Sequence, residues 1–356
     1  MNVYKMKHIQ SLKINRFRGI KDLFLTKLSP ITVFLGENSV GKSTVLESLF
    51  MTTGPNNPFM PMSITSMRAH GALNIKDVNY MFYDCDFTKT PSLEATFYDE
   101  EKRNLSIYPS YSFDESTDAV NISSIGNSNG ILTGLNCKFD INNKYSNYSG
   151  ESSIVRNSEG KWTPQIDSRY IEQIRSISLS PYNMLNSLFV EYSELIKAGK
   201  KDVILKALRN FDNRISKIEA TNDGLYIGYD HLENLVPLNM AGDGIQKYLR
   251  IAVCAYHPSI NMIFIDEIEN GLHFTAHRKL WNCILETAMT QHKQFFISTH
   301  NQETLKCLSS QVGKSEELKK LINIVTLSRS DDRIEPYYLS GNGFYGAMED
   351  EVEIRK

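Results

Sequence analysis

"ITVFLGENSVGKSTV", residues 31–45, is the stretch that decides the fold. It joins a compact β-type run, ITVFL, to a complete GxxxxGK[ST] motif that extends from Gly36 to Ser43, and a helical pattern starts near Lys42. In this context the glycines let the backbone wrap a phosphate, while N–H groups at the start of the helix point toward it. The stretch therefore predicts a strand, a phosphate-binding loop and a helix in succession.

The residues of this loop have separate predicted roles. We expect the Lys42 ammonium to contact the β and γ phosphates and to take part in catalysis, and the Ser43 hydroxyl to ligate Mg²⁺. The motif predicts a bound nucleotide. Its expected contacts in the loop are Gly36, Glu37, Asn38, Ser39, Val40, Gly41, Lys42, Ser43 and Thr44.

Two further apolar runs end in polar residues downstream. "NMIFIDE", residues 261–267, ends in Asp266, predicted to hold the metal through its water shell, and Glu267, predicted to be the general base or to orient the attacking water. "QFFISTH", residues 294–300, ends in His300, where a neutral imidazole can hydrogen-bond the γ-phosphate. From residue 245 onward helical and strand patterns alternate, which is typical of a parallel α/β sheet.

The middle of the chain has a different pattern. Residues 10–35 contain two β-type runs, and residues 55–75 indicate a loop or short helices. Aromatic β-type segments at 92–100, 104–111 and 131–140, separated by turns such as 121–130 and 142–150, predict an inserted antiparallel sheet. Further on we predict a helical pair within 183–213, broken at Ala198-Gly199, and a hairpin that turns at Asn222-Asp223-Gly224. The predicted parts are 1–75 (start of the core), 76–175 (β-rich insertion), 176–235 (helical lobe and hairpin) and 236–356 (rest of the core).

Composition excludes several classes of protein. The chain has 356 residues, 41% hydrophobic and 22% charged, with a formal net charge of −2, which argues against wholesale coating of nucleic acid. No apolar run reaches the length of about 18 residues that a membrane span needs, and the start lacks the apolar core of a signal peptide. Its 5 scattered cysteines suggest neither a disulfide framework nor a zinc site. We expect a cytoplasmic protein without a membrane partner.

"LNMAGDGIQ", residues 238–246, is a glycine turn about twenty residues before Asp266. Together with the phosphate loop, the acid pair and the histidine, in this order, it resembles the ATP-binding-cassette ATPase head, most of all the RecF/SMC-like and OLD-type ATPases. The opening "LKINRFRGIKDLFL" and the later "FIDEIENGLHFTAHRKLW" and "EDEVEIRK" strengthen the resemblance, the latter two to the OLD-like branch. It covers roughly residues 8–55 and 236–305.

The resemblance implies a composite site. In such heads the glycine motif of one subunit caps the nucleotide held by another, so ATP closes a head-to-tail homodimer or a higher homo-oligomer. By position, Gly242, Asp243 and Gly244 would present backbone N–H groups to the partner's γ-phosphate. The loop that couples the two sites would contain Glu269, Asn270 and His273, and the family's nucleotide-proximal arginine would be Arg18, with Arg16 close by.

The sequence departs from that pattern at two points. Ala241 stands where the signature serine usually lies, and one lost neutral hydrogen bond costs about 1 kcal/mol net. No Q-loop glutamine is convincing, since Gln165 and Gln173 cannot be placed from the sequence alone. The composite site is therefore expected to be weakened without being abolished.

The function implied is an ATP-dependent switch that hydrolyses ATP. OLD-type relatives usually carry a fused metal-dependent Toprim nuclease, and no fresh strand-plus-acid cluster follows His300, so we expect a separate effector, a nuclease or a toxin, as in bacterial anti-phage or toxin-like systems. Three alternatives stay open: a RecF-like clamp on duplex DNA, a transporter's ATPase subunit and a non-hydrolysing scaffold. The basic run from Lys197 to Lys201 is either a DNA contact or a solvated helix surface.

Overall fold

The structure is a computed structural model that describes residues 7–69, 75–112, 131–157, 159–181, 183, 185 and 187–355. The chain forms two compact units, and each is described by itself. The first contains Met1–Leu28, Glu37–Ile174 and Leu327–Tyr337; the second contains Ser29–Gly36, Arg175–Thr326 and Tyr338–Lys356. The units do not test the four-part division made from the sequence, which stays a prediction, and the turn expected at 121–130 lies outside the described residues.

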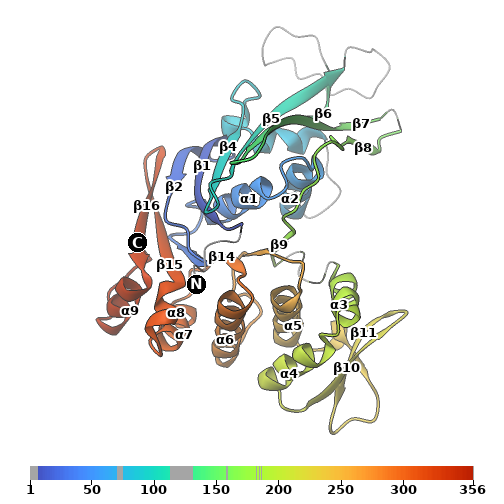
Figure 1. Ribbon diagram of the computed structural model, residues 1–356, viewed down its shortest axis with the longest axis vertical. Coiled ribbons are helices and arrows are strands. Elements are labelled where there is room, and N and C mark those ends of the chain that lie inside the picture. Colours follow the sequence, from blue (N-terminus) through green and yellow to red (C-terminus); the bar gives the residue numbers. More distant parts are fainter. Residues whose placement is uncertain are drawn as a thin grey trace. The chain divides into compact units, whose positions relative to one another are not determined.

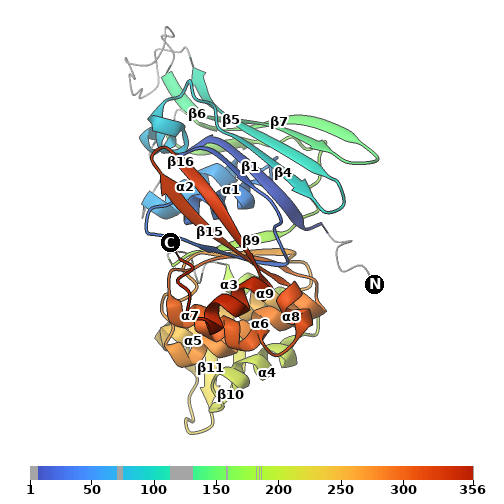
Figure 2. The same ribbon diagram turned by 90° about the vertical axis from the view of Figure 1, so that its left-hand side faces the viewer.

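The first unit is built on a seven-stranded antiparallel sheet with the order β2-β1-β4-β5-β6-β7-β8. Figure 2 shows β5, β6 and β7 as long neighbouring strands. Alternate residues of these strands are buried, as in β4, so that one face of the sheet carries the core. The strands are β1 (Ile9–Phe17), β2 (Ile20–Leu25), β4 (Ser92–Phe97), β5 (Lys102–Ser112), β6 (Ile131–Asn142), β7 (Asn147–Arg156) and β8 (Trp162–Gln165). Its helical elements are α1 (Lys42–Thr52), α2 (Phe59–Ala69), η1 (Ile75–Met81) and η2 (Tyr83–Cys85).

The antiparallel sheet confirms the predicted strands β4, β5 and β6 and corrects two details. Residues 10–35, expected to contain two strands, also contain β2, and β1 pairs with β4, so that the N-terminal hairpin belongs to the same sheet as the aromatic strands. Residues 147–150, expected to be part of a turn, begin β7. Pairing with β6 along its length, from Asn142↔Asn147 to Gly134↔Val155, overrides the low strand propensity of Asn, Ser and Gly.

The second unit is built on the six-stranded sheet β16-β15-β3-β14-β13-β9, and residues 327–337 of β15 and β16 are grouped with the first unit. β3, β14, β13 and β9 are neighbours and parallel, and β15 runs parallel to β3 on its other side. Every residue of β3, β13 and β14 is buried, which is the pattern of a parallel sheet covered on both faces. The bounds are β3 (Ile31–Leu35), β9 (Ser176–Leu179), β13 (Met262–Ile265), β14 (Gln294–Ser298), β15 (Ile322–Ser330) and β16 (Arg333–Ser340).

Helices α5, α6 and α7 pack side by side on one face of this sheet (Figure 1). Their apolar side chains share a core with alternate residues of the central strands, among them Val33, Ile263 and Ile297, and with the buried Trp281. The helices are α3 (Leu188–Lys197), α4 (Lys201–Phe211), α5 (Asp243–Tyr256), α6 (Phe274–Thr290), α7 (Gln302–Val312), α8 (Glu316–Lys320) and α9 (Gly341–Glu349), and η3 (Leu238–Met240) is a short 3-10 turn. A small antiparallel sheet contains β10 (Ile215–Thr221), β11 (Gly224–Tyr229) and β12 (Val236–Pro237).

These elements confirm most of the second unit's sequence-based prediction. The predicted helical pair is α3 and α4, and the predicted hairpin is β10 and β11. The alternation after residue 245 appears as α5, β13, α6, β14 and α7. β9 was missed, because four residues of Ser, Ile and Leu give too short a pattern to identify a strand.

Candidate functional site

The glycine loop after β3 has the backbone that a phosphate site requires. Gly36 (φ 135°) and Gly41 (φ 113°) are in the left-handed region that favours glycine, and Ser39 (φ 66°) shares it. Helix α1 begins at Lys42 with Gly41 as its N-cap and with no side-chain cap or acidic residue in the first turn. The first-turn N–H groups are therefore oriented to receive an anion. The Lys42 ammonium donates to the carbonyl oxygen of Glu37 at 2.8 Å, within the loop itself.

Two arginines hold α1 beside this loop through Glu47. Arg18 Nε lies 2.9 Å from one carboxylate oxygen of Glu47, and Arg68 Nε lies 2.6 Å from the other. Arg18 also donates to Thr65 Oγ1, and burial lowers its pKa. The structure thus places Arg18 against α1, and its expected contact with the nucleotide stays a prediction. Arg68, which sequence reasoning missed because α2 did not stand out as a helix, also reaches the hydroxyl of Thr44 at 3.5 Å.

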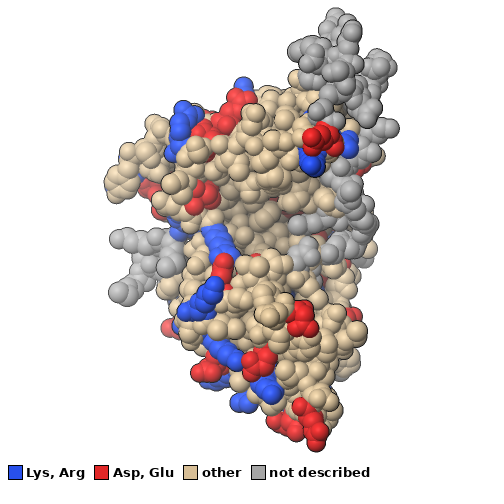
Figure 3. Space-filling view, turned by 90° about the vertical axis from the view of Figure 1, so that its right-hand side faces the viewer, with Lys and Arg blue, Asp and Glu red and all other residues tan. Residues whose placement is uncertain are grey.

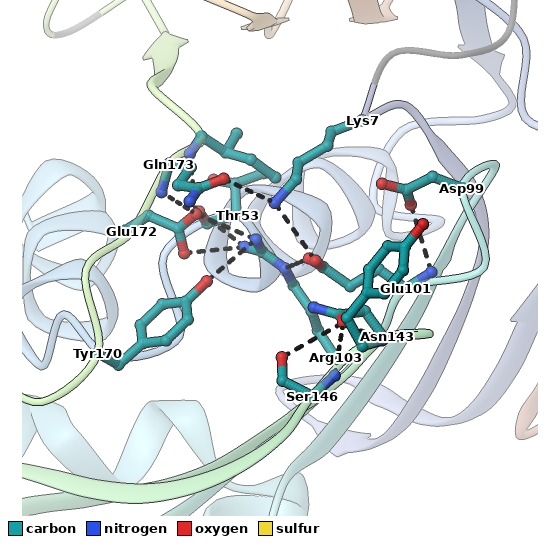
Figure 4. A network of polar contacts seen from close by, with 12 residues as sticks. Lys7, Thr53, Asp99, Glu101, Arg103, Asn143, Ser146, Tyr170, Glu172 and Gln173 are labelled. Carbon is teal, nitrogen blue, oxygen red and sulfur yellow. Dashed lines mark hydrogen bonds and ion pairs between the residues drawn. The ribbon is translucent and has the colours of Figure 1, made fainter.

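The far end of α1 is held by a fully buried arginine, Arg103 on β5. Its Nη1 donates to the carbonyl oxygens of Thr52 and Thr53, both at 3.2 Å, where the helix ends. Figure 4 shows the guanidinium between Glu172, bound at 2.9 and 3.0 Å, and Glu101, bound at 2.7 Å. A cation at a helix C-terminus interacts favourably with the helix dipole. Arg103 therefore fixes the helix that starts with the phosphate loop to the antiparallel sheet.

In the second unit, the carboxyl ends of β3, β14 and β13 share one edge of the sheet, because the three strands are parallel neighbours. Asp266 and Glu267 follow β13 there. The Ser298 hydroxyl accepts the Glu267 N–H at 2.9 Å and donates to Asp266 Oδ1 at 2.5 Å, so it holds both acids. Glu267 has φ 51°, a left-handed backbone that is unusual for a residue with a side chain and often marks functional sites. Its side chain is exposed.

His300 contacts the loop that follows the acid pair. Its Nδ1 lies 2.9 Å from Glu269 Oε1, which also accepts the His300 N–H at 3.1 Å, and Arg355 donates to the His300 carbonyl at 3.2 Å. A carboxylate only accepts hydrogen bonds, so Nδ1 carries a proton and Nε2 is the other ring nitrogen. The contact expected between His300 and the γ-phosphate would use Nε2, and it stays a prediction.

The glycine motif begins α5. Gly242 is the N-cap (φ −61°, ψ 145°), Asp243 and Gly244 form the first turn, and the buried Ala241 accepts a hydrogen bond from the side chain of Gln246 at 2.7 Å. A Cβ added at Gly242 would meet no described atom within 4 Å. Neither backbone angle nor packing within the described chain therefore explains why position 242 carries no side chain.

The loop after β13 also holds the other residues expected to couple two sites. The Asn270 carbonyl accepts from Lys247 of α5, and His273 caps α6, with Nδ1 3.0 Å from Thr275 Oγ1. Lys247 and Ser298, which hold the residues after β13, are site residues that sequence reasoning missed. Ser298 stood inside the motif QFFISTH without an assigned role, and a lysine on an amphipathic helix gave no signal at all.

Both Q-loop candidates belong to the first unit. Gln165 ends β8 in the first unit, and Gln173 accepts a hydrogen bond from Lys7. The strand beside β13 is β9, whose last residue Leu179 accepts the Asp266 N–H at 2.9 Å. The residue that follows β9 at the carboxyl edge of the sheet is Ser180, whose N–H and hydroxyl both donate to Asn183 Oδ1.

A buried parallel sheet in which one strand leads into a glycine phosphate loop and another ends in two acids defines a P-loop nucleotide hydrolase. Residues 6–304 match the AAA ATPase domain, so the chain belongs to that family and is an ATPase. The predicted fold class, an ATP-binding-cassette head of the RecF/SMC-like group with an antiparallel insertion and a helical lobe, is confirmed. The OLD-like branch stays a prediction.

Three similar proteins set this family in context. An ATP/GTP phosphatase from Helicobacter pylori is 24% identical over 369 residues, 97% of this chain and 99% of its own length. The DNA replication and repair protein RecF of Coxiella burnetii is 42% identical over 45 residues, 13% of each chain. A solved SMC head bound to the C-winged helix domain of ScpA covers 94% of this chain and 98% of its own, with a TM-score of 0.52 and 11% identity, which shows the fold alone. Among the described residues, no helix has the length and apolar character needed to cross a membrane.

Proposed function

We propose that this ATPase binds Mg²⁺-ATP through residues 36–44 and hydrolyses it with Glu267 as the base. Lys42 would contact the β and γ phosphates, and the Ser43 hydroxyl and the Asp266 carboxylate would hold Mg²⁺, directly or through water. Both are hard oxygen donors, which Mg²⁺ prefers, and this cation usually keeps several waters instead of a full protein cage. His300 would hydrogen-bond the γ-phosphate through Nε2, the ring nitrogen that does not face Glu269. Bound Mg²⁺ would stabilise the charge that develops on the phosphates.

We further propose that a second copy of the chain caps the nucleotide with Gly242, Asp243 and Gly244. The observation that carries this proposal is Gly242 itself, which is exposed, has ordinary backbone angles and would meet nothing if it carried a Cβ. A glycine that its own chain does not need is explained when an outside group approaches its backbone closely. The uncapped start of α5 adds N–H groups and a positive dipole end.

Three variants test these two proposals. Glu267→Gln should lower phosphate release by about 100-fold or more while ATP binding and ATP-dependent dimerisation persist, because only the base is lost. Gly242→Asp should abolish both dimerisation and turnover, since a carboxylate would face the phosphate. Ala241→Ser is the matched control and should leave both nearly unchanged.

Dimerisation is measured by light scattering with and without ATP. The capping proposal fails if Gly242→Asp dimerises like the wild type. GTP should be assayed beside ATP.

The closing and opening of such a dimer would control a separate effector, a nuclease or toxin, as in a bacterial anti-phage system. What supports this is the sequence resemblance described above. Glu267→Gln would trap the closed state, so the test is to purify it from its host and identify bound proteins, with Gly242→Asp as the control that cannot close. An effector bound equally by both variants would contradict control by dimer closure.

A duplex-DNA clamp is the second candidate, favoured by the match to RecF. Two observations speak against it. Lys201, in the basic run, forms an ion pair with Glu219 at 3.1 Å, and on the described part of the face in Figure 3 basic and acidic residues are interspersed. ATP-dependent binding to duplex DNA that weakens steeply with salt would support the clamp, and no binding at low salt would remove it.

A further inference from the structure

The ammonium of Lys247 lies inside the loop that follows β13. It donates to the carbonyl oxygen of Glu267 at 2.8 Å and to that of Asn270 at 2.7 Å, and the residue is only 4% exposed. Lys247 belongs to α5, one helical turn after Asp243 at the start of that helix. One side chain therefore joins the helix that carries the glycine motif to the loop that carries the acid proposed as the base.

The two carbonyls define the shape of the 267–270 turn. The Asn270 N–H donates to the Glu267 carbonyl at 3.0 Å, so this oxygen accepts from both the turn and the lysine. At Glu267 the backbone is in the left-handed region (φ 51°), which a residue with a side chain adopts only where its surroundings impose it. Ser298 holds the N–H of this residue and Lys247 holds its carbonyl, so the two contacts fix the backbone on both sides of the Glu267 Cα.

Charge also favours an ammonium at this point. Glu269, Glu267 and Asp266 all attract it, while burial, with the charge of Lys247 as a further cause, lowers the pKa of His277 on α6. Burial outweighs this attraction and lowers the pKa of Lys247 to about 8. Burying an ammonium that is held by backbone carbonyls costs free energy. A side chain that served for packing alone would not need this charge.

We propose that Lys247 is a positioning residue for ATP hydrolysis, which holds the 267–270 turn so that Glu267 faces the nucleotide and which moves that turn when α5 moves. The inference rests on the proposed function, because it takes Glu267 as the base. Helix α5 would then have two roles. Its N-terminus would contact the partner's nucleotide, and Lys247 would couple any movement of the helix to the position of Glu267.

The chain contains a matched control, Lys293. It is 3% exposed, its ammonium donates to the carbonyl of His257 at 2.6 Å and to that of Ile260, and burial lowers its pKa to about 8. These carbonyls precede β13, whereas those of Lys247 follow it. Lys293 is therefore also a buried lysine that donates to two backbone carbonyls, but it lies at the other end of β13, where there is no candidate site residue.

The experiment compares Lys247→Met, Lys247→Arg and Lys293→Met in the full-length protein, with kcat, KM for ATP and Tm measured for each. We expect Lys247→Met to lower kcat by at least about tenfold while KM stays within about threefold, because the phosphate loop is untouched. Lys247→Arg should recover part of kcat, since it keeps the charge and the donors. Lys293→Met should change Tm by about as much as Lys247→Met does, but keep kcat within about twofold. Equal kcat losses at both positions, or none at Lys247, would overturn the proposal.

A double variant separates this inference from the function on which it rests. If Lys247 acts through Glu267, then Lys247→Met should cause no further loss in the residual hydrolysis of Glu267→Gln, because the two changes remove one unit. A further loss would indicate a general structural role and overturn the inference. Where Lys247→Met does not fold, Lys247→Gln, which keeps an amide donor, replaces it in each comparison. Should Glu267→Gln itself hydrolyse normally, it is the proposed function that fails.

Discussion

Arg103 in the first unit and Lys247 in the second are both buried cations that donate to two backbone carbonyls. Arg103 closes the end of the phosphate-loop helix at Thr52 and Thr53, and Lys247 closes the loop after β13. They differ in their anionic partners. Arg103 is bound directly by Glu101 and Glu172, whereas Lys247 forms no ion pair among the described residues and is attracted by its acidic neighbours from a greater distance.

The partners decide the direction of each pKa. Burial works to lower the pKa of Arg103, but attraction to Glu172 and Glu101 outweighs it and the pKa is raised. At Lys247 burial prevails, and its pKa falls to about 8. A buried cation paired with carboxylates thus keeps its charge, and a buried cation held by carbonyls is the one whose charge can change near neutral pH.

Arg103→Met should show the largest effect in this comparison. It leaves Glu172 without this counter-charge and Glu101 with Lys7 alone, at 3.3 Å, so we expect a loss of about 3–5 kcal/mol in the free energy of unfolding. Urea denaturation measures it, and Arg103→Lys, which keeps a charge but fewer donors, should lie between. A loss below about 1 kcal/mol would mean that the pair is not what fixes α1 to the sheet.

The free energy of unfolding should depend on pH through a lysine held by carbonyls, such as Lys293, and not through Arg103, which is paired with carboxylates. For Lys293 the folded pKa is about 8 and the ordinary value is 10.5, so the unfolded chain binds more protons between these values. The charged amine therefore costs stability below pH 8, and the cost disappears as pH rises toward 10.5. Relative to Lys293→Met, the wild type should gain up to about 3 kcal/mol from pH 7.5 to 10, by denaturation at both pH values. A pH-independent difference would show that Lys293 titrates normally.

The next largest effect, on kcat, is expected at Ser298, the last residue of β14. Ser298→Ala removes the hydroxyl that holds Glu267 and Asp266, and we expect kcat to fall about tenfold, equivalent to about 1.4 kcal/mol. Thr32→Val is the control: Thr32 is fully buried on β3 of the same sheet, and among the described residues its hydroxyl bonds the backbone of Ser29. It should lower Tm without lowering kcat; if both variants lose activity alike, the hydroxyl at 298 has no special role.

The smallest effect is expected where a cation is exposed. Arg68 binds Glu47 at 2.6 Å but its side chain is 43% exposed, so solvent screens the pair. Arg68→Ala should change the free energy of unfolding by less than about 1 kcal/mol. Arg18→Ala, at the same carboxylate but 9% exposed, should cost clearly more in the same denaturation assay. Equal losses would mean that burial does not set the strength of these pairs.

Patterns that lie within one short stretch were readable from the sequence. The phosphate loop, the acid pair after β13 and the alternation of helix and strand depend on local spacing, and the structure has these elements where they were predicted. β9 and the start of β7 were not readable, because their own residues have weak strand propensity and pairing with β13 and β6 makes them strands. Likewise neither candidate for a Q-loop glutamine lies after β9, the strand beside β13.

The sequence by itself determined the class of this protein, because a phosphate loop needs particular residues at fixed spacing between a strand and a helix. Only the tertiary structure decided which side chains support those residues. Arg103 meets Thr52 and Glu172 from positions about fifty and seventy residues away, and Lys247 meets Glu267 from twenty residues away. Such contacts depend on how strands and helices pack, and a buried cation leaves no periodic trace in the chain that carries it.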